Sequence, residues 1–494
     1  MSSKRPFHIH IESVGDPWNN VRVQRFSGRE SISQIFSFEL EVVCDVESEL
    51  PESAYTGAPV SIVIEVDDRE VRRIHGQLGP ILDRLEPIGD HRTYVLNVKP
   101  RAFWMTLVET QEIYLDLTVP EIIQRKLEMY GFGTEDFEMR LRATYPKREI
   151  VVQYGESDLA FISRLAEHMG MSFFFEHENG RDKIVFTDNP SGFRPLEGKD
   201  EVTFHQRGEA AGVFALHVTT DTVPGSYFVQ DYNYRAPHVD PNGEYRLEAG
   251  GQGGVVEYGS HVKTPSEAEQ LARIRAEERA ATMKIYEGKS SAPTLEAGRR
   301  TALVDHPRLA TREELLPLEV KHEASMPFFH KRDAEPPVYR NEFRAIPAGV
   351  VYRPPRRTPK PRMPSVVTGI IQPWLGGKVG GTARLDAEGR YTVQLHFDTA
   401  PPGGSKSSHP VRMSQPFAGE GNAMHFPLLP GSEVLVAFTN GDPDRPVIIG
   451  ALPNTTSPSA IDDREARKHR LETSKGILVE FGITDRVRAR QERS

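Results

Sequence analysis

Cysteine is almost absent from this sequence of 494 residues, which contains Cys44 alone. One thiol cannot form an intramolecular disulfide, so a fold held together by disulfides is excluded. Cys44 ends the strand-like segment FSFELEVVC. That position favours a buried, unreactive thiol over a catalytic one, because a catalytic thiol needs a histidine that the fold brings close.

Long apolar runs and an excess of basic charge are also missing. No run approaches the roughly 20 residues that a membrane-spanning helix needs, and the opening MSSKRPFHIHIE lacks the apolar core of a signal peptide. The 61 basic and 70 acidic residues give a net charge of −9, and both signs are interleaved along the chain. We therefore expect a soluble protein made in the cytoplasm, with no nucleic acid among its partners.

The sequence contains none of the common catalytic templates. G-x-S-x-G, H-E-x-x-H, a phosphate-binding P-loop and C-x-x-C are all absent, and GGKVGG at 376–381 has the composition of a turn. His8 and His10 share one face of a predicted strand and could hold a metal, but no third ligand can be named, which favours ordinary packing. The sequence thus assigns no catalytic, cofactor-binding or metal-ligating residue, and it implies no cofactor.

What the sequence has in abundance is turn-forming residues and short strand patterns. Its 38 prolines and 40 glycines favour a β-rich architecture, and its length predicts two to four domains. Partly alternating, β-branched or aromatic runs predict strands in the first hundred residues at FHIHIES, VRVQRFSG, FSFELEVV, PVSIVIEV and HRTYVLNV.

Three segments carry helix signals. Each opens with a hydroxyl side chain that can cap a helix, at Thr118, Ser157 and Thr264, and the first and third have a glutamate three residues later. Gly131 and Gly170 are placed to end the first two helices. The many Glu/Arg pairs of the third helix favour a solvated face over a binding stripe. After the second helix, Asn179-Gly180 predicts the turn of a hairpin.

A proline- and arginine-rich segment, YRPPRRTPKPRMP at 352–364, is the one sharp change in composition. Its prolines predict an extended, stiff chain. We interpret residues 351–365 as a strap between domains. A site for an anionic surface and a ligand for a proline-recognition domain are the alternatives.

Beyond this segment, about five short strands within 366–454 predict a small Greek-key barrel of the OB type. Two of its apolar runs flank FTNGDPDRPVIIG at 438–450, which looks like a site but also has the composition of a turn. Gly441 allows positive φ, Asp442 can cap the turn, Asp444 and Arg445 can pair, and Pro446 begins the next strand. A structural connector is favoured, with an inter-subunit contact and a metal or catalytic role as alternatives.

Three stretches together resemble the VgrG family, the spike proteins of bacterial type VI secretion systems, and their phage tail-hub relatives. They are VVQYGESDLAFISRLAEHMGMSFFFEH at 151–177, EGRYTVQLHFD at 388–398, and VRMSQPFAGEGNAMHFPLLPGSEVLVAFTNGDPDRPVIIGALPN at 411–454. The resemblance covers about residues 7–482. Asp398 follows Phe397 where the family often has tryptophan, which puts local aromatic packing in doubt.

The resemblance implies a mainly β fold with inserted helices (α+β). Tail-hub-like β-barrel domains would occupy 1–350, the Pro/Arg-rich linker 351–365, the OB-fold domain 366–454, and a neck with the start of a trimeric β-prism or β-helix needle 455–494. RLETSKGILVEFGITDRV near the end alternates like one strand. An isolated strand cannot pair its backbone groups, so we also expect three chains to wrap around each other there.

The resemblance further implies a non-enzymatic homotrimer. Its expected partners are the Hcp tube hexamer, a PAAR tip protein, effectors or their adaptors and chaperones, baseplate components and, transiently, a target membrane. The protein would be cytoplasmic before firing and then translocated. The short tail indicates no fused effector enzyme. The hub of a phage tail or of an extracellular contractile particle stays open as an alternative, as does an enzyme such as a cell-wall hydrolase, although no inserted domain of suitable size is visible.

Overall fold

The chain forms two compact units in a computed structural model that describes residues 7–13, 18, 21–45, 57–88, 91–196, 198–205, 211–326, 337–372, 383, 385–399, 410–474, 476–481 and 487–491. The first unit comprises Met1–Glu109, Thr118–Pro146 and Ser157–Lys360. The second comprises Thr110–Leu117, Lys147–Glu156 and Pro361–Ser494. Two short segments from the first third of the sequence therefore belong to the C-terminal unit. The domain boundaries expected from the sequence remain a prediction.

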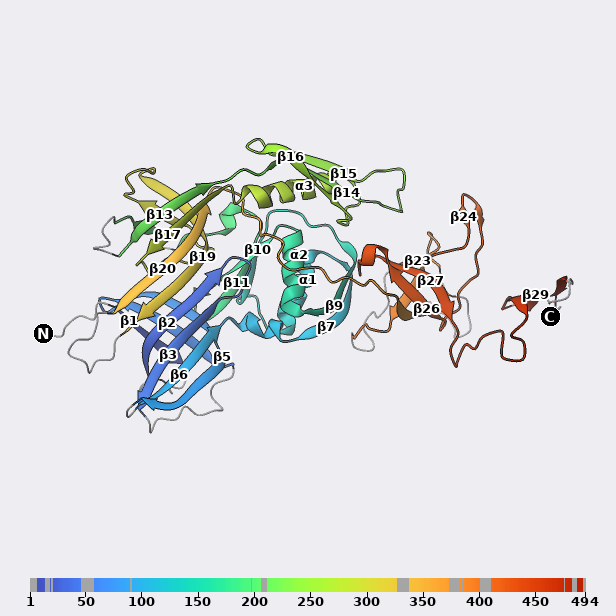
Figure 1. Ribbon diagram of the computed structural model, residues 1–494, viewed down its shortest axis with the longest axis horizontal. Helices are drawn as coiled ribbons and strands as arrows, with labels where there is room; N and C mark the ends of the chain where they lie inside the picture. Colours follow the sequence, from blue (N-terminus) through green and yellow to red (C-terminus); the bar gives the residue numbers. More distant parts are fainter. Residues whose placement is uncertain are drawn as a thin grey trace. The chain divides into compact units, whose positions relative to one another are not determined.

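A twelve-stranded sheet organises the first unit (Figure 1). One half contains, in spatial order, β1 (His8–Ser13), β4 (Pro59–Val66), β5 (Arg69–Ile88), β6 (His91–Lys99), β3 (Ser37–Asp45) and β2 (Arg22–Ser31). The other half contains β19 (Arg312–Ser325), β20 (Val338–Pro347), β17 (Lys284–Ser290) and β13 (Val213–Thr220), with β18 (Thr301–Val304) on β19 and β12 (Glu201–Thr203) on β18. The halves join where β2 pairs with β19.

All five strands predicted for the first hundred residues are present. Strand β5 was not predicted, because its twenty residues contain seven charged side chains together with glycine and proline. It nevertheless pairs with both β4 and β6, and its register shifts at bulges. Alternate residues of the neighbouring strands point into the core, where the rings of Phe26 and Phe38 stack with centroids 5.5 Å apart.

The three predicted helices are α1 (Val119–Met129), α2 (Asp158–His168) and α3 (Pro265–Ala280). Thr118 forms the complete capping box with Glu121, and the Ser157 hydroxyl accepts from the amide of Ala160. Thr264 caps the amide of Glu267, but the Glu267 carboxylate accepts from Lys263, so the third box is only half formed.

Two smaller sheets complete the first unit. Strands β10 (Ser172–Glu178) and β11 (Arg181–Thr187) form the predicted hairpin, and β8 (Phe137–Arg140) pairs with β11. Asn179 and Gly180 both have positive φ at its turn, as a type I′ turn requires. Strands β14 (Pro224–Gln230), β15 (Asn242–Arg246) and β16 (Gly251–Tyr258) form the other sheet, along which α3 packs (Figure 1).

The prediction of a solvated charged face on α3 was wrong for two of its residues. Arg275 and Glu277 are both buried. Arg275 donates to Glu257 of β16 at 2.8 Å, and Glu277 accepts from Arg353 of the proline-rich segment at 2.8 Å. Both β16 and the proline-rich segment contact the helix, so some of its charged side chains form ion pairs with them and others face solvent.

In the second unit, β21 (Val367–Ile371), β22 (Tyr391–Leu395), β23 (Pro410–Met413), β26 (Glu433–Phe438) and β27 (Pro446–Leu452) close into the predicted five-stranded barrel. The strand pair β7 (Glu109–Leu117) and β9 (Arg148–Ser157) packs against it. The ring of Tyr154 meets Phe397 edge-on at 5.1 Å, and Thr399 donates to the carbonyl of Gln111.

The C-terminal segment differs from the prediction of one isolated strand. It contains β28 (His469–Glu472), β29 (Ile477–Phe481) and β30 (Val487–Gln491), which pair antiparallel within one chain. The alternating pattern did not reveal that the chain reverses direction between these strands. Only the central strand, β29, has a partner on both sides, and β28 and β30 are edge strands. The needle wrapped from three chains stays a prediction.

Candidate functional site

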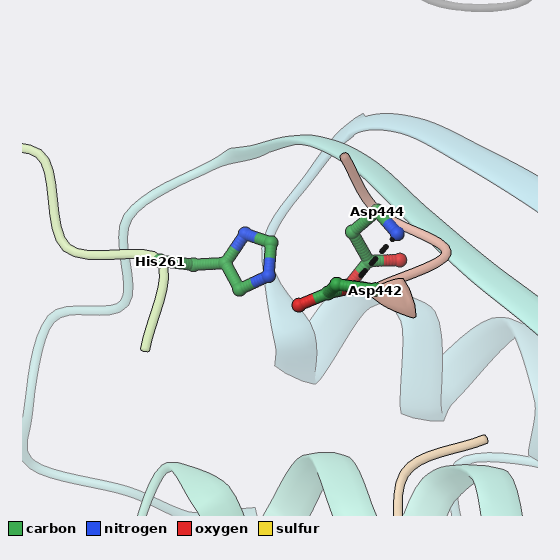
Figure 2. A group of neighbouring side chains, drawn as sticks. All are labelled: His261, Asp442 and Asp444. Atoms are coloured by element: carbon green, nitrogen blue, oxygen red, sulfur yellow. Dashed lines mark hydrogen bonds between the residues drawn. The ribbon is translucent and has the colours of Figure 1, made fainter. Parts of the chain in front are cut away.

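The stretch at 438–450 is a tight turn between β26 and β27. Asn440 and Gly441 both adopt positive φ, as expected for Gly441, and Pro446 begins β27. Figure 2 shows Asp442 and Asp444, with the dashed line marking the hydrogen bond from the Asp444 amide to Oδ1 of Asp442 at 3.0 Å. Asp442 thus caps its own turn, as predicted. The predicted pairing of Asp444 with Arg445 stays a prediction.

The same turn is tied to two distant parts of the second unit. Oδ1 of Asp444 accepts from the backbone amide of Val152 in β9 at 2.7 Å. The Gly441 carbonyl accepts from the amide of Met363, whose side chain enters the barrel core. Backbone groups of three separate segments are therefore satisfied at one place. This geometry supports the structural connector, since two of these bonds serve backbone groups from outside the turn.

The proline-rich segment is extended, as predicted, and two of its four arginines form ion pairs with the first unit. The Arg353 guanidinium donates to Glu277 and to the carbonyls of Gly170 and Asp188. Arg356 pairs with carboxylates of α3 and β16. Because the first unit itself matches the charge of Arg353 and Arg356, the segment is better described as a fastened strap than as a site for an anionic surface.

A buried ionic cluster lies in the first unit around Arg72. Its guanidinium contacts Glu30 at 2.8 Å and Glu296 at 3.2 Å. Burial raises the pKa of Glu30, but Arg72 and His322 outweigh it and hold that pKa at about 2. Burial lowers the pKa of His322, whose Nε2 lies 2.9 Å from Glu30. Strands β2, β5 and β19 supply Glu30, Arg72 and His322, and Glu296 comes from the segment between β17 and β18. The cluster therefore links both halves of the large sheet.

A cleft of about 600 Å³ opens in the first unit beside β1, β4, β5 and the β10–β11 turn. On its wall the Ser61 hydroxyl lies 2.8 Å from Nδ1 of His75, and burial lowers the pKa of that histidine. Burial also raises the pKa of Asp182 to about 6. The arginines at its wall are ion-paired; Arg101 and Arg181, for example, both contact Asp136. The cleft joins segments far apart in the sequence, which explains why no motif pointed to it.

The remaining residues singled out from the sequence have structural surroundings. Cys44 is buried, as predicted, and burial raises the pKa of its thiol. The rings of His8 and His10 stack with centroids 5.6 Å apart on one face of β1, and Nε2 of His10 lies 3.3 Å from Glu12. The helices in the described part of the chain are all too short or too polar to cross a membrane.

Two family profiles match the chain in the order of its two units. Residues 29–327 match the phage tail baseplate hub (GPD) family, and residues 377–452 match the type VI secretion system/phage-baseplate injector OB domain. The first match covers more than half of the sequence. The chain therefore belongs to the phage tail baseplate hub family.

Within this class, the relatives found include several spike proteins named VgrG, which confirms the resemblance seen in the sequence. The chain is 29% identical to the Pseudomonas aeruginosa type VI secretion system spike protein VgrG4b, over 89% of this chain and 55% of that protein. It is 30% identical to VgrG5 of the same organism, over 90% of this chain and 57% of that protein. The chain thus spans little more than half the length of these relatives.

The fold is also that of a solved component of a type VI secretion system. The E. coli c3393 protein, described as a component of the type VI secretion system similar to T4 bacteriophage tail proteins gp27 and gp5, matches with a TM-score of 0.65. The match covers 90% of this chain and 99% of that one at 24% identity. The predicted fold class is therefore confirmed: a mainly β, hub-like fold followed by an OB barrel.

Proposed function

We propose that the protein is a structural, non-enzymatic spike or hub at the tip of a type VI secretion system, and that it acts as a homotrimer. The observation that carries this proposal is the order of hub and OB modules in one chain, matched by both family profiles. The spike proteins among its relatives support it. In this role the chain docks on the Hcp tube, contacts baseplate components, carries effectors with their adaptors and pierces a target membrane beneath a PAAR tip protein.

The side chains that most resemble catalytic or metal-binding groups have contacts that support a scaffold role. The aspartates of the 442–444 turn hold backbone amides, and the cluster around Arg72 joins two halves of a sheet. In the Ser61–His75 pair of the cleft, the serine faces Nδ1, and no carboxylate is recorded at the other ring nitrogen within the described residues. A serine hydrolase would use that second position to orient the imidazole. We therefore propose no enzymatic activity for this chain.

The alternative is a hub of a phage tail or of an extracellular contractile particle. The profile that matches residues 29–327 is itself that of a phage baseplate hub, which is the observation that favours this reading. On either reading the protein is made in the cytoplasm and leaves the cell only with the assembled machine. The two differ in whether release requires a membrane-anchored apparatus or accompanies free particles.

Mass measurement of the full chain in solution tests the proposal most directly. We expect a trimer by light scattering and native mass spectrometry at micromolar concentration, and co-purification with a hexameric tube protein from the same gene cluster. A monomer at all concentrations up to about 100 µM would count against a self-assembling spike. Peptidoglycan hydrolysis by the purified protein, lost on Asp182→Asn or Ser61→Ala, would overturn the non-enzymatic role.

A further inference from the structure

A projecting hairpin on the OB barrel has no core of its own. Residues 415–429, called the finger below, contain only the two-residue strands β24 (Ala418–Gly419) and β25 (Asn422–Ala423), which pair with each other. Figure 1 shows β24 on a loop that extends away from the barrel strands β26 and β27. An isolated two-stranded hairpin is only marginally stable in water. A hairpin with strands this short therefore needs packing contacts with other parts of a protein.

The finger carries large apolar side chains in solvent. Phe417 is 57% exposed, Met424 49% and Phe426 46%. Between residues 415 and 430 the sequence has one acidic or basic residue, Glu420, apart from a histidine. Exposed apolar side chains with little charge among them are typical of the centre of a protein interface rather than of a solvated loop.

The base of the finger is fixed while its arms project. The amide of Leu428 donates to the Tyr391 hydroxyl at 3.1 Å, and the His425 ring lies over the Tyr391 ring. The Ser414 amide donates to the carbonyl of Ile448 in β27. Residues 416–424 then leave about four residues per arm, a reach of about 13 Å at roughly 3.3 Å per residue. Since packed sheets lie about 10 Å apart, the arms are long enough to contact a neighbouring barrel.

An exposed apolar side chain also lies on the wall of the same barrel. Ile449 of β27 is 46% exposed, and among the described residues of the five barrel strands it is the one large apolar side chain exposed to this degree. Every copy of the chain therefore carries both a projecting apolar finger and an apolar position on the barrel wall. In a threefold ring, two different patches of one subunit meet head to tail, and the contacts close after three copies.

We propose that the finger of one copy docks on the β27 wall of the next copy, around Ile449, and so fastens the OB barrels of the trimer. This inference rests on the homotrimer of the proposed function. A second copy is favoured over an unrelated protein because the smaller, second unit holds nine of the nineteen exposed large apolar side chains recorded for the described residues. Such a concentration indicates that this unit assembles with itself along much of its surface.

Engineered cysteines test the contact, because the single native cysteine is buried. In the full-length chain, Phe417→Cys combined with Ile449→Cys should form inter-chain disulfides on mild oxidation, giving covalent dimers and trimers on denaturing gels. Each single variant should give none of this ladder beyond background. A wild-type trimer together with a double variant that forms no ladder would overturn the finger contact and leave the proposed function standing. A wild-type monomer would overturn both.

A second variant measures how much the contact contributes. Replacing Phe417, Met424 and Phe426 together by serine should raise the concentration of half-assembly about tenfold or more, since a few central side chains carry most of the binding energy of an interface. The matched control replaces Val256 and Tyr258, which are 71% and 59% exposed on β16, and should assemble as the wild type does. Unchanged assembly of the finger variant would overturn the proposal, including the case in which it loses binding to another protein instead.

Discussion

Removing one arginine should detach the proline-rich strap from the first unit. Arg353 donates from Nε to Glu277 at 2.8 Å, and from Nη1 to the carbonyls of Gly170 at 3.0 Å and Asp188 at 2.7 Å. Both ionic partners are largely buried. Arg353→Ala therefore breaks a fork-shaped ion pair and leaves two carbonyls and a carboxylate without this donor.

The size of the effect follows from these contacts. Hydrogen bonds to charged groups contribute about 1.5–3 kcal/mol each, and they are not additive when they share one side chain. We expect the free energy that holds the strap in place to fall by about 3 kcal/mol. Each 1.4 kcal/mol is a factor of ten, so the detached population should rise about 100-fold. Arg353→Lys keeps the charge but not the planar fork of donors, and it should raise the detached population about tenfold.

Hydrogen exchange and limited trypsin digestion measure this opening. The amide of Thr358 donates to Glu167 at 2.9 Å, so its exchange reports directly on the strap. Cleavage after Arg356 should accelerate by the same factor. Arg357→Ala is the matched control, because that side chain is exposed on the same strap and its replacement should change little. If Arg353→Ala opens the strap no faster than Arg357→Ala does, the reasoning from these contacts is wrong.

Three further predictions concern stability. Asp444→Ala should destabilise the second unit by about 2 kcal/mol in denaturant titration, because the backbone amide of Val152 loses a charged acceptor. Lys126→Met should cost about 3–5 kcal/mol, because it removes the ammonium 2.9 Å from the buried carboxylate of Asp158. Burial lowers the pKa of His177 to about 3, whereas this histidine in the unfolded chain has a pKa of about 6.5. Between these pH values the unfolded chain therefore binds a proton that the folded chain does not bind. Stability should therefore fall as pH drops below 6.5, and His177→Phe should remove about 3 kcal/mol of this loss between pH 7 and pH 4.5.

Each of these has a neighbouring control. Asp442→Ala removes the cap within the turn and should cost less than Asp444→Ala, and the reverse order would refute the role given to the β9 contact. Arg125→Met on the exposed side of α1 should change stability by less than about 0.5 kcal/mol. Identical pH profiles for wild type and His177→Phe would show that other groups carry the acid sensitivity.

Local signals predicted much of the fold. The capping residues of α1 and α2, the Asn179-Gly180 turn and the strands of the OB barrel were all visible in the sequence, because each depends on residues within a few positions. Strand β5 was not visible, because bulges and charges disrupt its alternation and its pairing partners decide its conformation. Strands β28 and β29 were predicted as one strand, since alternation alone does not reveal where a chain turns back.

The turn at 438–450 illustrates the same division. The sequence by itself determined that Gly441 and Pro446 make a stiff connection between two apolar strands, because φ preferences are local. It also determined the family, through motifs that keep their order along the chain. Only the tertiary structure decided that Asp444 holds an amide 292 positions away and that Arg353 fastens a strap to α3. Such contacts depend on how distant segments pack, and no periodicity or composition records which carboxylate will face which backbone group.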